Sequence, residues 1–336
     1  VGDEAGTAIT TGDENVAIGF EALKTEDTGR QSVAIGYQAL KTQNKDDTNL
    51  NTAIGYQAGT SITLGVSNDI FGGSAGDALT EGSFNVAIGR SSLSTDTLGS
   101  QSVAVGHAAL ATQNFTTATN ALNTAVGHEA GNDITTGIRN TLIGGLSGDS
   151  LTDADFNVAL GYGSLRGDTL GSTSVAIGYH ALRVQNFTTA TDSNNTAVGY
   201  NAGTAVSTGT LNTFVGGTAG DAITDGADNV ALGYNSLGAD TRGSKSTALG
   251  KEALKVQNQT TSVSTYNVAV GFKSGVAVTT GIQNTFVGGH AGDGTDDGDN
   301  NTAVGYLALS ANCGNNNTAV GLETLKVCTG ADNTAM

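Results

Sequence analysis

Residues 51–55 read Asn-Thr-Ala-Ile-Gly, and this five-residue motif returns at 68–72, 85–89 and 102–106 with Asn or Ser first and Gly last. Nineteen glycines occupy the last position of this motif, and most of them are 17 residues apart. From Gly55 onward the intervals 17, 17, 17 and 21 run three times, so a superrepeat of 72 residues underlies the shorter one. A short fixed repeat over a whole chain is typical of a solenoid, in which each coil contacts only its neighbours.

The repeat predicts an all-β fold, a parallel β-solenoid or β-roll with about 17 residues per coil. We expect one continuous solenoid over residues 1–336, with superrepeats at approximately 55–126, 127–198, 199–270 and 271–336. Both ends of the sequence fall inside a motif, which favours a segment of a longer fibre, since terminal solenoid coils are normally atypical. Proline is absent, as expected where every strand donates hydrogen bonds to a neighbour.

Side chains within one motif alternate between two faces of a strand. The fourth position is Ile, Val, Leu or Phe in nearly every coil, so we expect it in the coil interior, together with the β-branched second position. The third and fifth positions are mostly Ala and Gly, which predicts that another backbone packs closely against that face. A second short element follows, as at 37–40, with Ala39 and Leu40 buried, giving two strands and two turns per coil. Because such a coil is thin, burial of the Ala/Gly face between identical chains favours a homo-oligomer.

The first motif position is Asn in fifteen coils and Ser in four. One interpretation is a ladder of side chains that binds a ligand. We favour the other, in which stacked amides hydrogen-bond from coil to coil and cap the turns.

The third position becomes bulky once per superrepeat, and in the same coils the residue after the motif glycine is also glycine. The bulky residues are Ile70, Leu142, Phe214 and Phe286, and the glycines are Gly73, Gly145, Gly217 and Gly289. Close packing matches added volume at one site with lost volume at another, so the pattern predicts that the two positions compete for one space, either within a coil or across a subunit boundary.

Charge and hydropathy narrow the set of partners. Acidic residues outnumber basic ones 31 to 14, and the net charge is −17. This charge repels phosphate backbones, so we expect no nucleic acid partner. No run of 18 apolar residues occurs, so we expect no membrane insertion by this segment.

The motif also resembles a known family. Residues 15–19 and 85–89 (Asn-Val-Ala-Ile-Gly), with 32–36 and 174–178 (Ser-Val-Ala-Ile-Gly), resemble the head repeats of YadA-like trimeric autotransporter adhesins. The longer form at 51–59, Asn-Thr-Ala-Ile-Gly-Tyr-Gln-Ala-Gly, resembles repeats of bacteriophage tail fibres. These resemblances imply a left-handed parallel β-roll, a homotrimer along the fibre axis, and an extracellular location on a virion tail fibre or a bacterial cell surface. The sequence departs from the adhesin heads in its 17-residue spacing and its superrepeat.

Catalytic signals are sparse, and we expect neither enzyme activity nor a cofactor. The four histidines, His107, His128, His180 and His290, lie in ordinary coil registers, far apart in the predicted stack. None repeats with a Ser or Cys nucleophile beside it, so no catalytic triad can be built.

Four segments beginning at Gly72, Gly144, Gly216 and Gly288 are similar to the repeats of calcium-binding β-rolls. Their candidate calcium ligands are Asp77, Asp149, Asp221 and Asp293. Calcium β-rolls share an ion between successive coils, whereas these aspartates return only every fourth coil, roughly 19 Å apart. We therefore favour a role in turns over calcium binding.

The 21-residue coils carry a four-residue insertion after Gln-Asn, at 113–119, 185–191 and 257–262. Such loops should project from one edge of the stack, where a rigid scaffold commonly presents recognition residues. The candidate contact residues are Asn114, Phe115, Asn186, Phe187, Asn258 and Gln259. For the two phenylalanines we favour packing over the strand end, because exposed Phe is unfavourable.

Two cysteines, Cys313 and Cys328, lie 15 residues apart in adjacent coils. Neighbouring coils are about 4.8 Å apart, so a disulfide is feasible. A pair of reduced cysteines is the equal alternative.

These observations favour a non-enzymatic fibre segment, structural or adhesive, from a phage tail fibre or bacterial surface adhesin. It would be a homotrimer that rigidly presents elements binding a host-cell glycan or receptor. The alternative is a module that binds polysaccharide or ice through repeated Thr and Asn positions. That module needs a Thr array on every coil, whereas Thr-Thr-Gly recurs only at 10–12, 135–137 and 279–281.

Overall fold

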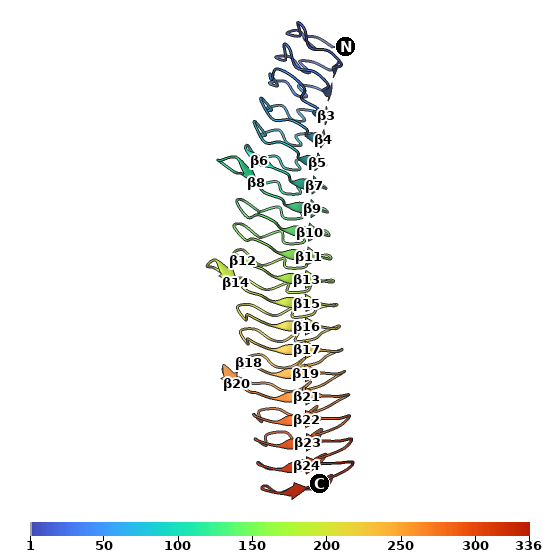
Figure 1. Ribbon diagram of the computed structural model, residues 1–336, viewed down its shortest axis with the longest axis vertical. Helices are drawn as coiled ribbons and strands as arrows, with labels where there is room; N and C mark the ends of the chain where they lie inside the picture. The colour runs from blue at the N-terminus through green and yellow to red at the C-terminus, as the bar shows by residue number, and fades with distance from the viewer. Residues whose placement is uncertain (1) are drawn as a thin grey trace. The chain divides into compact units, whose positions relative to one another are not determined.

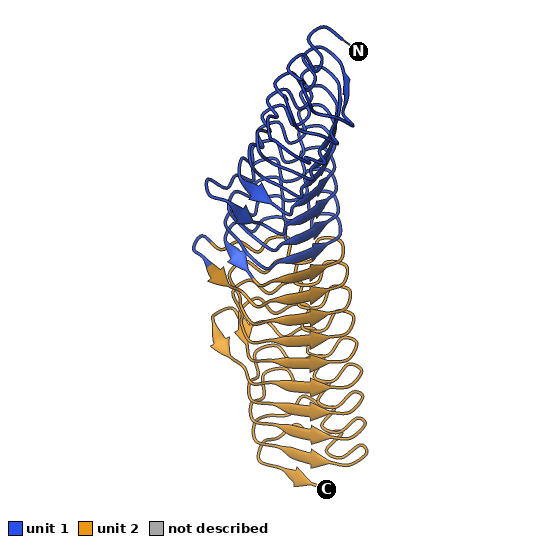
Figure 2. Cartoon of the chain, turned by 45° about the horizontal axis from the view of Figure 1, so that its top comes forward, with its two compact units in different colours: residues 1–172, 188–190 blue, residues 173–187, 191–336 orange. Residues whose placement is uncertain are grey.

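The structure is a computed structural model that describes residues 2–336. These residues form strands and turns without a helix, and so include no helical segment long and apolar enough to cross a membrane. The chain divides into two compact units, residues 1–172 with 188–190 and residues 173–187 with 191–336 (Figure 2). Each unit is a parallel β-solenoid of about 17 residues per coil, which confirms the predicted fold class. Continuity over residues 1–336 and the left-handed sense stay predictions.

Each coil contributes one short main strand, built from the second to fourth motif positions (Figure 1). The N-terminal unit contains β1 (Val16–Ile18), β2 (Val33–Ile35), β3 (Thr52–Ile54), β4 (Asp69–Phe71), β5 (Val86–Ile88), β7 (Val103–Val105), β9 (Thr124–Val126), β10 (Thr141–Ile143) and β11 (Val158–Leu160). The C-terminal unit contains β13 (Val175–Ile177), β15 (Thr196–Val198), β16 (Thr213–Val215), β17 (Val230–Leu232), β19 (Thr247–Leu249), β21 (Val268–Val270), β22 (Thr285–Val287), β23 (Thr302–Val304), β24 (Thr318–Val320) and β25 (Thr334–Ala335). Within each unit successive main strands pair in parallel with equal motif positions opposite each other, as Ala87 opposite Ala104.

The prediction of a second strand in every coil is wrong for most coils. Within residues 2–336 the additional strands lie beside the insertions: β6 (Gly99–Ser100), β8 (Thr119–Asn120), β12 (Gly171–Ser172), β14 (Thr191–Asp192), β18 (Gly243–Ser244) and β20 (Val263–Ser264). Strand β6 pairs with β8, and β18 pairs with β20, in parallel. Elsewhere the chain returns through turns whose backbone groups still hydrogen-bond from coil to coil, as Leu40 N to Ala58 O at 3.1 Å.

The two faces of the main strand are the reverse of the prediction. The third motif position is fully buried in the coil interior, as at Ala87 and Ala104, and Ala39 and Leu40 of the return turn are buried as predicted. The second and fourth positions point outward, and Ile18 and Ile88 are 44% and 39% exposed. The interior is narrow where a buried leucine of the return turn, such as Leu93, leaves room only for a methyl group at the third position. The larger branched side chains therefore lie outside.

The motif glycine is explained by stacking within the chain, not by a neighbouring chain. A Cβ atom built on Gly89 would lie 2.4 Å from the carbonyl oxygen of Gly106 in the next coil. The φ angle of Gly89 is +127°, a conformation that side chains rarely adopt. The predicted close backbone is therefore confirmed, but it belongs to the next coil of the same chain, and the third position is buried inside the coil, so these positions form no Ala/Gly face for a second chain.

The bulky third-position residues are also buried, and glycines at another position make room for them. In nine coils the ninth residue, counted from the motif Asn or Ser, is a buried leucine such as Leu237, and in eight coils it is glycine. Around Phe214 this residue is glycine, and Cβ atoms on Gly203 and Gly220 would lie 2.8 Å and 2.6 Å from the Phe214 ring. Phe214 thus fills the space that leucines fill elsewhere in the core.

The predicted competition between the bulky residue and the glycine after the motif is wrong. A Cβ atom on Gly217 would contact only the Tyr234 ring, at 3.5 Å, and one on Gly73 would have no neighbour within 4 Å. Gly217 therefore leaves space beside an exposed tyrosine, whereas Phe214 is fully buried. The two changes coincide in the sequence but occur in different places.

The first-position asparagines form the predicted structural ladder. Asn68 donates its backbone N–H to Asn51 Oδ1 at 2.9 Å, and Asn85 donates in the same way to Asn68 at 3.0 Å. The side-chain amide of each asparagine also donates to a turn carbonyl, as Asn85 to Gly99 O at 3.0 Å. These residues are buried, so their polar atoms are used for stacking the coils and a ligand ladder is excluded.

Candidate functional site: an outward apolar and aromatic surface

The outward side chains of the main strands form an apolar surface, here called the strand face. It consists of the second and fourth motif positions of each coil. Its most exposed apolar members are Val16, Ile18, Phe71, Ile88 and Ile143 in the N-terminal unit and Val230, Leu232, Leu249, Val287, Val304 and Val320 in the C-terminal unit. Scattered exposed hydrophobic residues are ordinary, but a repeated apolar surface marks an interaction site.

The residue after the motif glycine adds a column of exposed rings, here called the ring ladder. Phe20, Tyr37 and Tyr56 stack in the N-terminal unit with centroids 5.4 Å and 5.1 Å apart, and Tyr179 stacks on Tyr200 at 5.4 Å in the other unit. The regular coil spacing places these rings in register, close to the separation that favours offset stacking.

Glycines interrupt the ring ladder once per superrepeat. Tyr56 precedes Gly73 and is 57% exposed, whereas Tyr37, with a ring on each side, is 41% exposed. Lysine replaces a ring at one position, and Lys251 Nζ lies 5.9 Å from the ring centroids of both Tyr234 and Phe272. The column therefore presents aromatic faces and a cation to solvent.

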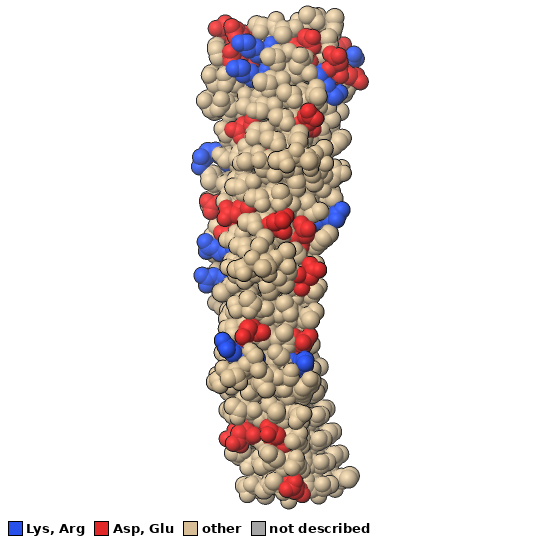
Figure 3. Space-filling view, turned by 90° about the vertical axis from the view of Figure 1, so that its left-hand side faces the viewer, with Lys and Arg blue, Asp and Glu red and all other residues tan. Residues whose placement is uncertain are grey.

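Charged side chains gather in separate groups with uncharged surface between them on the face shown in Figure 3. Among the ion pairs of the chain, Glu21 accepts from Lys24 at 2.6 Å and contacts Lys41 at 2.7 Å. The Lys24 hydrogen bond, with that of Lys41, lowers the pKa of Glu21 to about 2. Among the second and fourth motif positions only Asp69 is charged, so the strand face itself is largely uncharged.

Each insertion loop is anchored by a buried carboxylate that the sequence did not identify. Asp96 accepts from the backbone N–H groups of Gly99 and Phe115 at 3.0 and 3.1 Å and from Gln113 Nε2 at 2.6 Å. Gln113 Oε1 in turn accepts from Asn123 Nδ2 at 2.9 Å. Desolvation raises the pKa of Asp96. The equivalent Asp240 accepts from the backbone N–H groups of Gly243 and Gln259.

The anchoring decides which loop residues are accessible. Phe115, Phe187 and Gln259 are buried, so their prediction as contact residues is wrong. The burial of the two phenylalanines agrees with the packing role that the sequence favoured. Asn114 is half-buried, whereas Asn186 and Asn258 are exposed. The loop tips, at 116–118, 188–190 and 260–262, are the exposed parts.

The four candidate calcium ligands share one geometry. The Oδ1 atom of each is buried and has no hydrogen-bond partner. Desolvation is the largest cause that raises the pKa of Asp77, Asp149 and Asp221. Within residues 2–336 none of the four belongs to a group of three metal-ligating side chains. Calcium binding stays a prediction.

The raised pKa of Asp221 predicts a pH dependence of stability. The folded chain binds the Asp221 proton more tightly than the unfolded chain does. The stabilisation that this proton gives the fold is therefore complete below the ordinary Asp pKa of 3.8, and it is lost as pH rises through the pKa of Asp221 in the folded chain. We expect Asp221→Asn to be more favourable, relative to the parent chain, at pH 7 than at pH 4. Urea unfolding at both pH values measures this difference. The exposed Asp228→Asn serves as the control, and equal pH dependence in the two variants would refute the assignment.

The two cysteines are free thiols in adjacent coils. Cys313 is buried, and its Sγ donates to the carbonyl oxygen of Cys328 at 2.8 Å. Burial, with the neighbouring Cys328, raises the pKa of Cys313 to about 12. A thiol with so high a pKa forms little thiolate, the reactive species. The disulfide stays a prediction.

Comparison with protein-family models gave no matching family, and comparison with curated proteins gave no significant match. Function is therefore inferred from the geometry of the outward surface.

Proposed function

We propose that this chain is a structural or adhesive fibre segment that assembles as a homotrimer through its strand face. The observation that carries this proposal is the repeated apolar surface on the outward side of the main strands. Three copies around a common axis would bury this surface along the fibre, as closed cyclic symmetry allows. The exposed loop tips would then be available to a glycan or receptor on a host-cell surface.

The chemistry of the surface supports this proposal over a catalytic role. Apart from Asp69, the second and fourth motif positions up to Val320 carry Val, Ile, Leu, Phe and Thr, which bury well against like surfaces. The resemblance to trimeric adhesin heads and tail-fibre repeats supports the same assembly. An extracellular fibre, on a virion or a bacterial cell, is the setting that we propose.

A second candidate is a module that binds polysaccharide or ice. The buried asparagines are unavailable for it, but outward threonines support it, since Thr285, Thr302, Thr318 and Thr334 lie opposite one another on successive strands. A monomer that binds such a surface through its strand face would favour this function.

The mass of the particle in solution tests the proposed trimer. We expect three chains per particle by light scattering. Val287 and Val304 lie opposite each other on β22 and β23 and are each 37% exposed, so replacing both with Glu should give folded monomers. Carboxylates brought together around an axis repel and lose solvation.

The matched control places the same charges elsewhere. Thr260→Glu with Thr261→Glu adds two carboxylates to an exposed loop tip and should leave the trimer intact. A monomeric parent chain, or a trimer that survives the strand-face substitutions, would disprove assembly through this face.

A further inference from the structure

Two histidines that the sequence placed far apart lie side by side in the ring ladder. His107 follows β7 and His128 follows β9, and because these strands pair in register, the two imidazoles stack with centroids 5.1 Å apart. The 21-residue interval from His107 to His128 is one coil with an inserted loop. The expectation that all four histidines are separated in the stack is therefore wrong for this pair.

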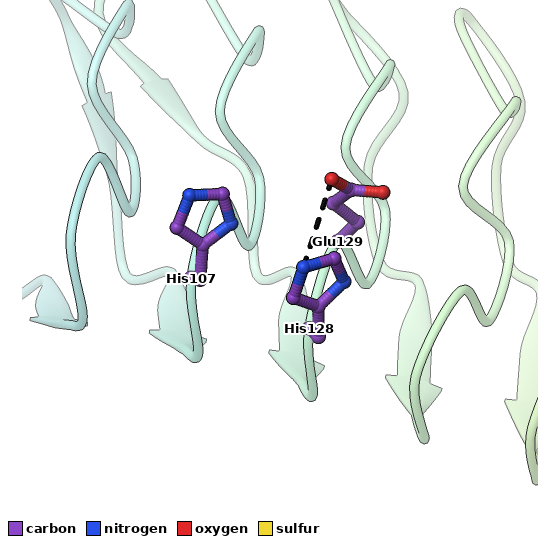
Figure 4. Close-up of side chains that lie close together, drawn as sticks. All are labelled: His107, His128 and Glu129. Carbon is purple, nitrogen blue, oxygen red and sulfur yellow. Dashed lines mark ion pairs between the residues drawn. The ribbon is translucent and has the colours of Figure 1, made fainter.

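Glu129 completes a cluster around these rings (Figure 4). Its Oε1 atom lies 3.8 Å from Nε2 of His128, and the two histidines and the glutamate each offer one ligand atom within 4.8 Å of the others. Glu129 is held in place because its backbone N–H donates to the carbonyl oxygen of His107 at 2.9 Å. The cluster is thus fixed by the pairing of two coils.

One ring nitrogen of this cluster is an unexplained polar atom. Nδ1 of His107 is buried without a hydrogen-bond partner, an arrangement that is unfavourable for a polar group. The other nitrogen, Nε2, is in contact with the guanidinium of Arg90 in the preceding coil. A guanidinium only donates, so Arg90 occupies the lone pair of His107 Nε2 that a metal ion would need.

We propose that His107, His128 and Glu129 form a zinc site, with water as the fourth ligand. Two imidazole nitrogens and one carboxylate oxygen are a donor set that suits Zn²⁺, whereas Ca²⁺ takes six or more oxygens. Ligand atoms of a tetrahedral zinc site lie about 3.3 Å apart, so the side chains must close inward by about 1–1.5 Å. His128 is exposed and has the freedom to turn.

Arg90 acts as a competitor in this site. Its side chain is exposed, and zinc ligation by His107 requires the guanidinium to leave the imidazole and turn to solvent. The charge of Arg90 also repels the incoming cation. The zinc ion must therefore replace the Arg90 guanidinium beside His107, and this exchange sets the zinc affinity.

Calorimetric titration of the full chain with ZnCl₂ at pH 7.5 tests the site. We expect saturable binding of one zinc ion per chain. His128→Ala and Glu129→Gln should each weaken binding by about 10-fold or more. Arg90→Ala should strengthen it, and titration with CaCl₂ should give no binding at this site.

A variant of an unrelated histidine is the matched control. His180→Ala removes an imidazole that lies against Tyr179 in the C-terminal unit and should leave zinc affinity unchanged. A zinc-dependent rise in the unfolding midpoint, lost in His128→Ala, is the second measurement. The site is overturned if the parent chain shows no saturable binding, if binding appears only after Arg90→Ala, or if His128→Ala and Glu129→Gln bind as tightly as the parent.

Discussion

Replacing Phe214 with Ala is expected to lower the unfolding free energy of the C-terminal unit by about 3–5 kcal/mol, the cost of emptying a buried aromatic site. Phe214 is fully buried, and its ring contacts the backbone of two coils through Gly203 and Gly220. The rigid coil-to-coil hydrogen bonds limit collapse around the cavity, so the expected value lies well above that for a surface substitution. Urea unfolding followed by circular dichroism measures it.

A double-mutant cycle with Gly220 separates cavity formation from overpacking. Gly220→Ala alone should destabilise by about 2–4 kcal/mol, because its Cβ would lie 2.6 Å from ring carbons of Phe214 and its φ is +59°. In the Phe214→Ala background the ring is gone, so the two costs should be less than additive by about 1 kcal/mol or more.

Gly217→Ala is the control for this cycle. It lies in the same coil, but its Cβ would contact only the Tyr234 ring, at 3.5 Å, so we expect a change within about 0.5 kcal/mol. Strong coupling of Gly217→Ala to Phe214→Ala would instead support the competition predicted from the sequence and would contradict the packing described above.

Replacing Asn212 with Ala should destabilise the same unit by about 2–5 kcal/mol, because two buried hydrogen bonds lose their partner. Asn212 Oδ1 accepts from the backbone N–H of Asn229 at 3.0 Å, and its Nδ2 donates to Gly226 O at 2.9 Å. Both groups lie inside the stack, where water has no access to replace the lost partner. Thermal or urea unfolding provides the measurement.

Serine should not rescue this position, although four coils carry it naturally. In those coils a glutamine completes the network, as Gln257 Nε2 donates to Ser246 Oγ at 2.9 Å and Gln257 Oε1 accepts from Asn267 at 2.8 Å. The equivalent residue for Asn212 is Ile223, which offers no polar group. Asn212→Ser should therefore resemble Asn212→Ala, whereas exposed Asn120→Ala should have little effect. A parent-like stability of Asn212→Ala would contradict a structural ladder.

The insertion loops show how sequence and tertiary information divide. The Gln-Asn pattern located each loop, and the unfavourable exposure of Phe predicted burial of Phe115 and Phe187. The buried anchors were missed, because Asp96 and Asp240 resemble ordinary turn aspartates in the sequence. Only the stacking of coils brings Phe115 N–H and Gln113 Nε2 to the same carboxylate.

The sequence by itself determined the coil, its length and its parallel stacking, because a fixed 17-residue interval places equal residues opposite each other. It also determined the role of the first-position asparagines, since a polar residue repeated at a turn is satisfied by its neighbours. Tertiary structure alone decided which strand face is inside. Alternation defines two faces but does not indicate which one is buried, and the side chain of the return turn decides it, since leucine there leaves room for alanine and glycine leaves room for a larger residue. It likewise decided that His107 and His128 are neighbours, since an inserted loop lengthens the chain between two positions without separating them in space.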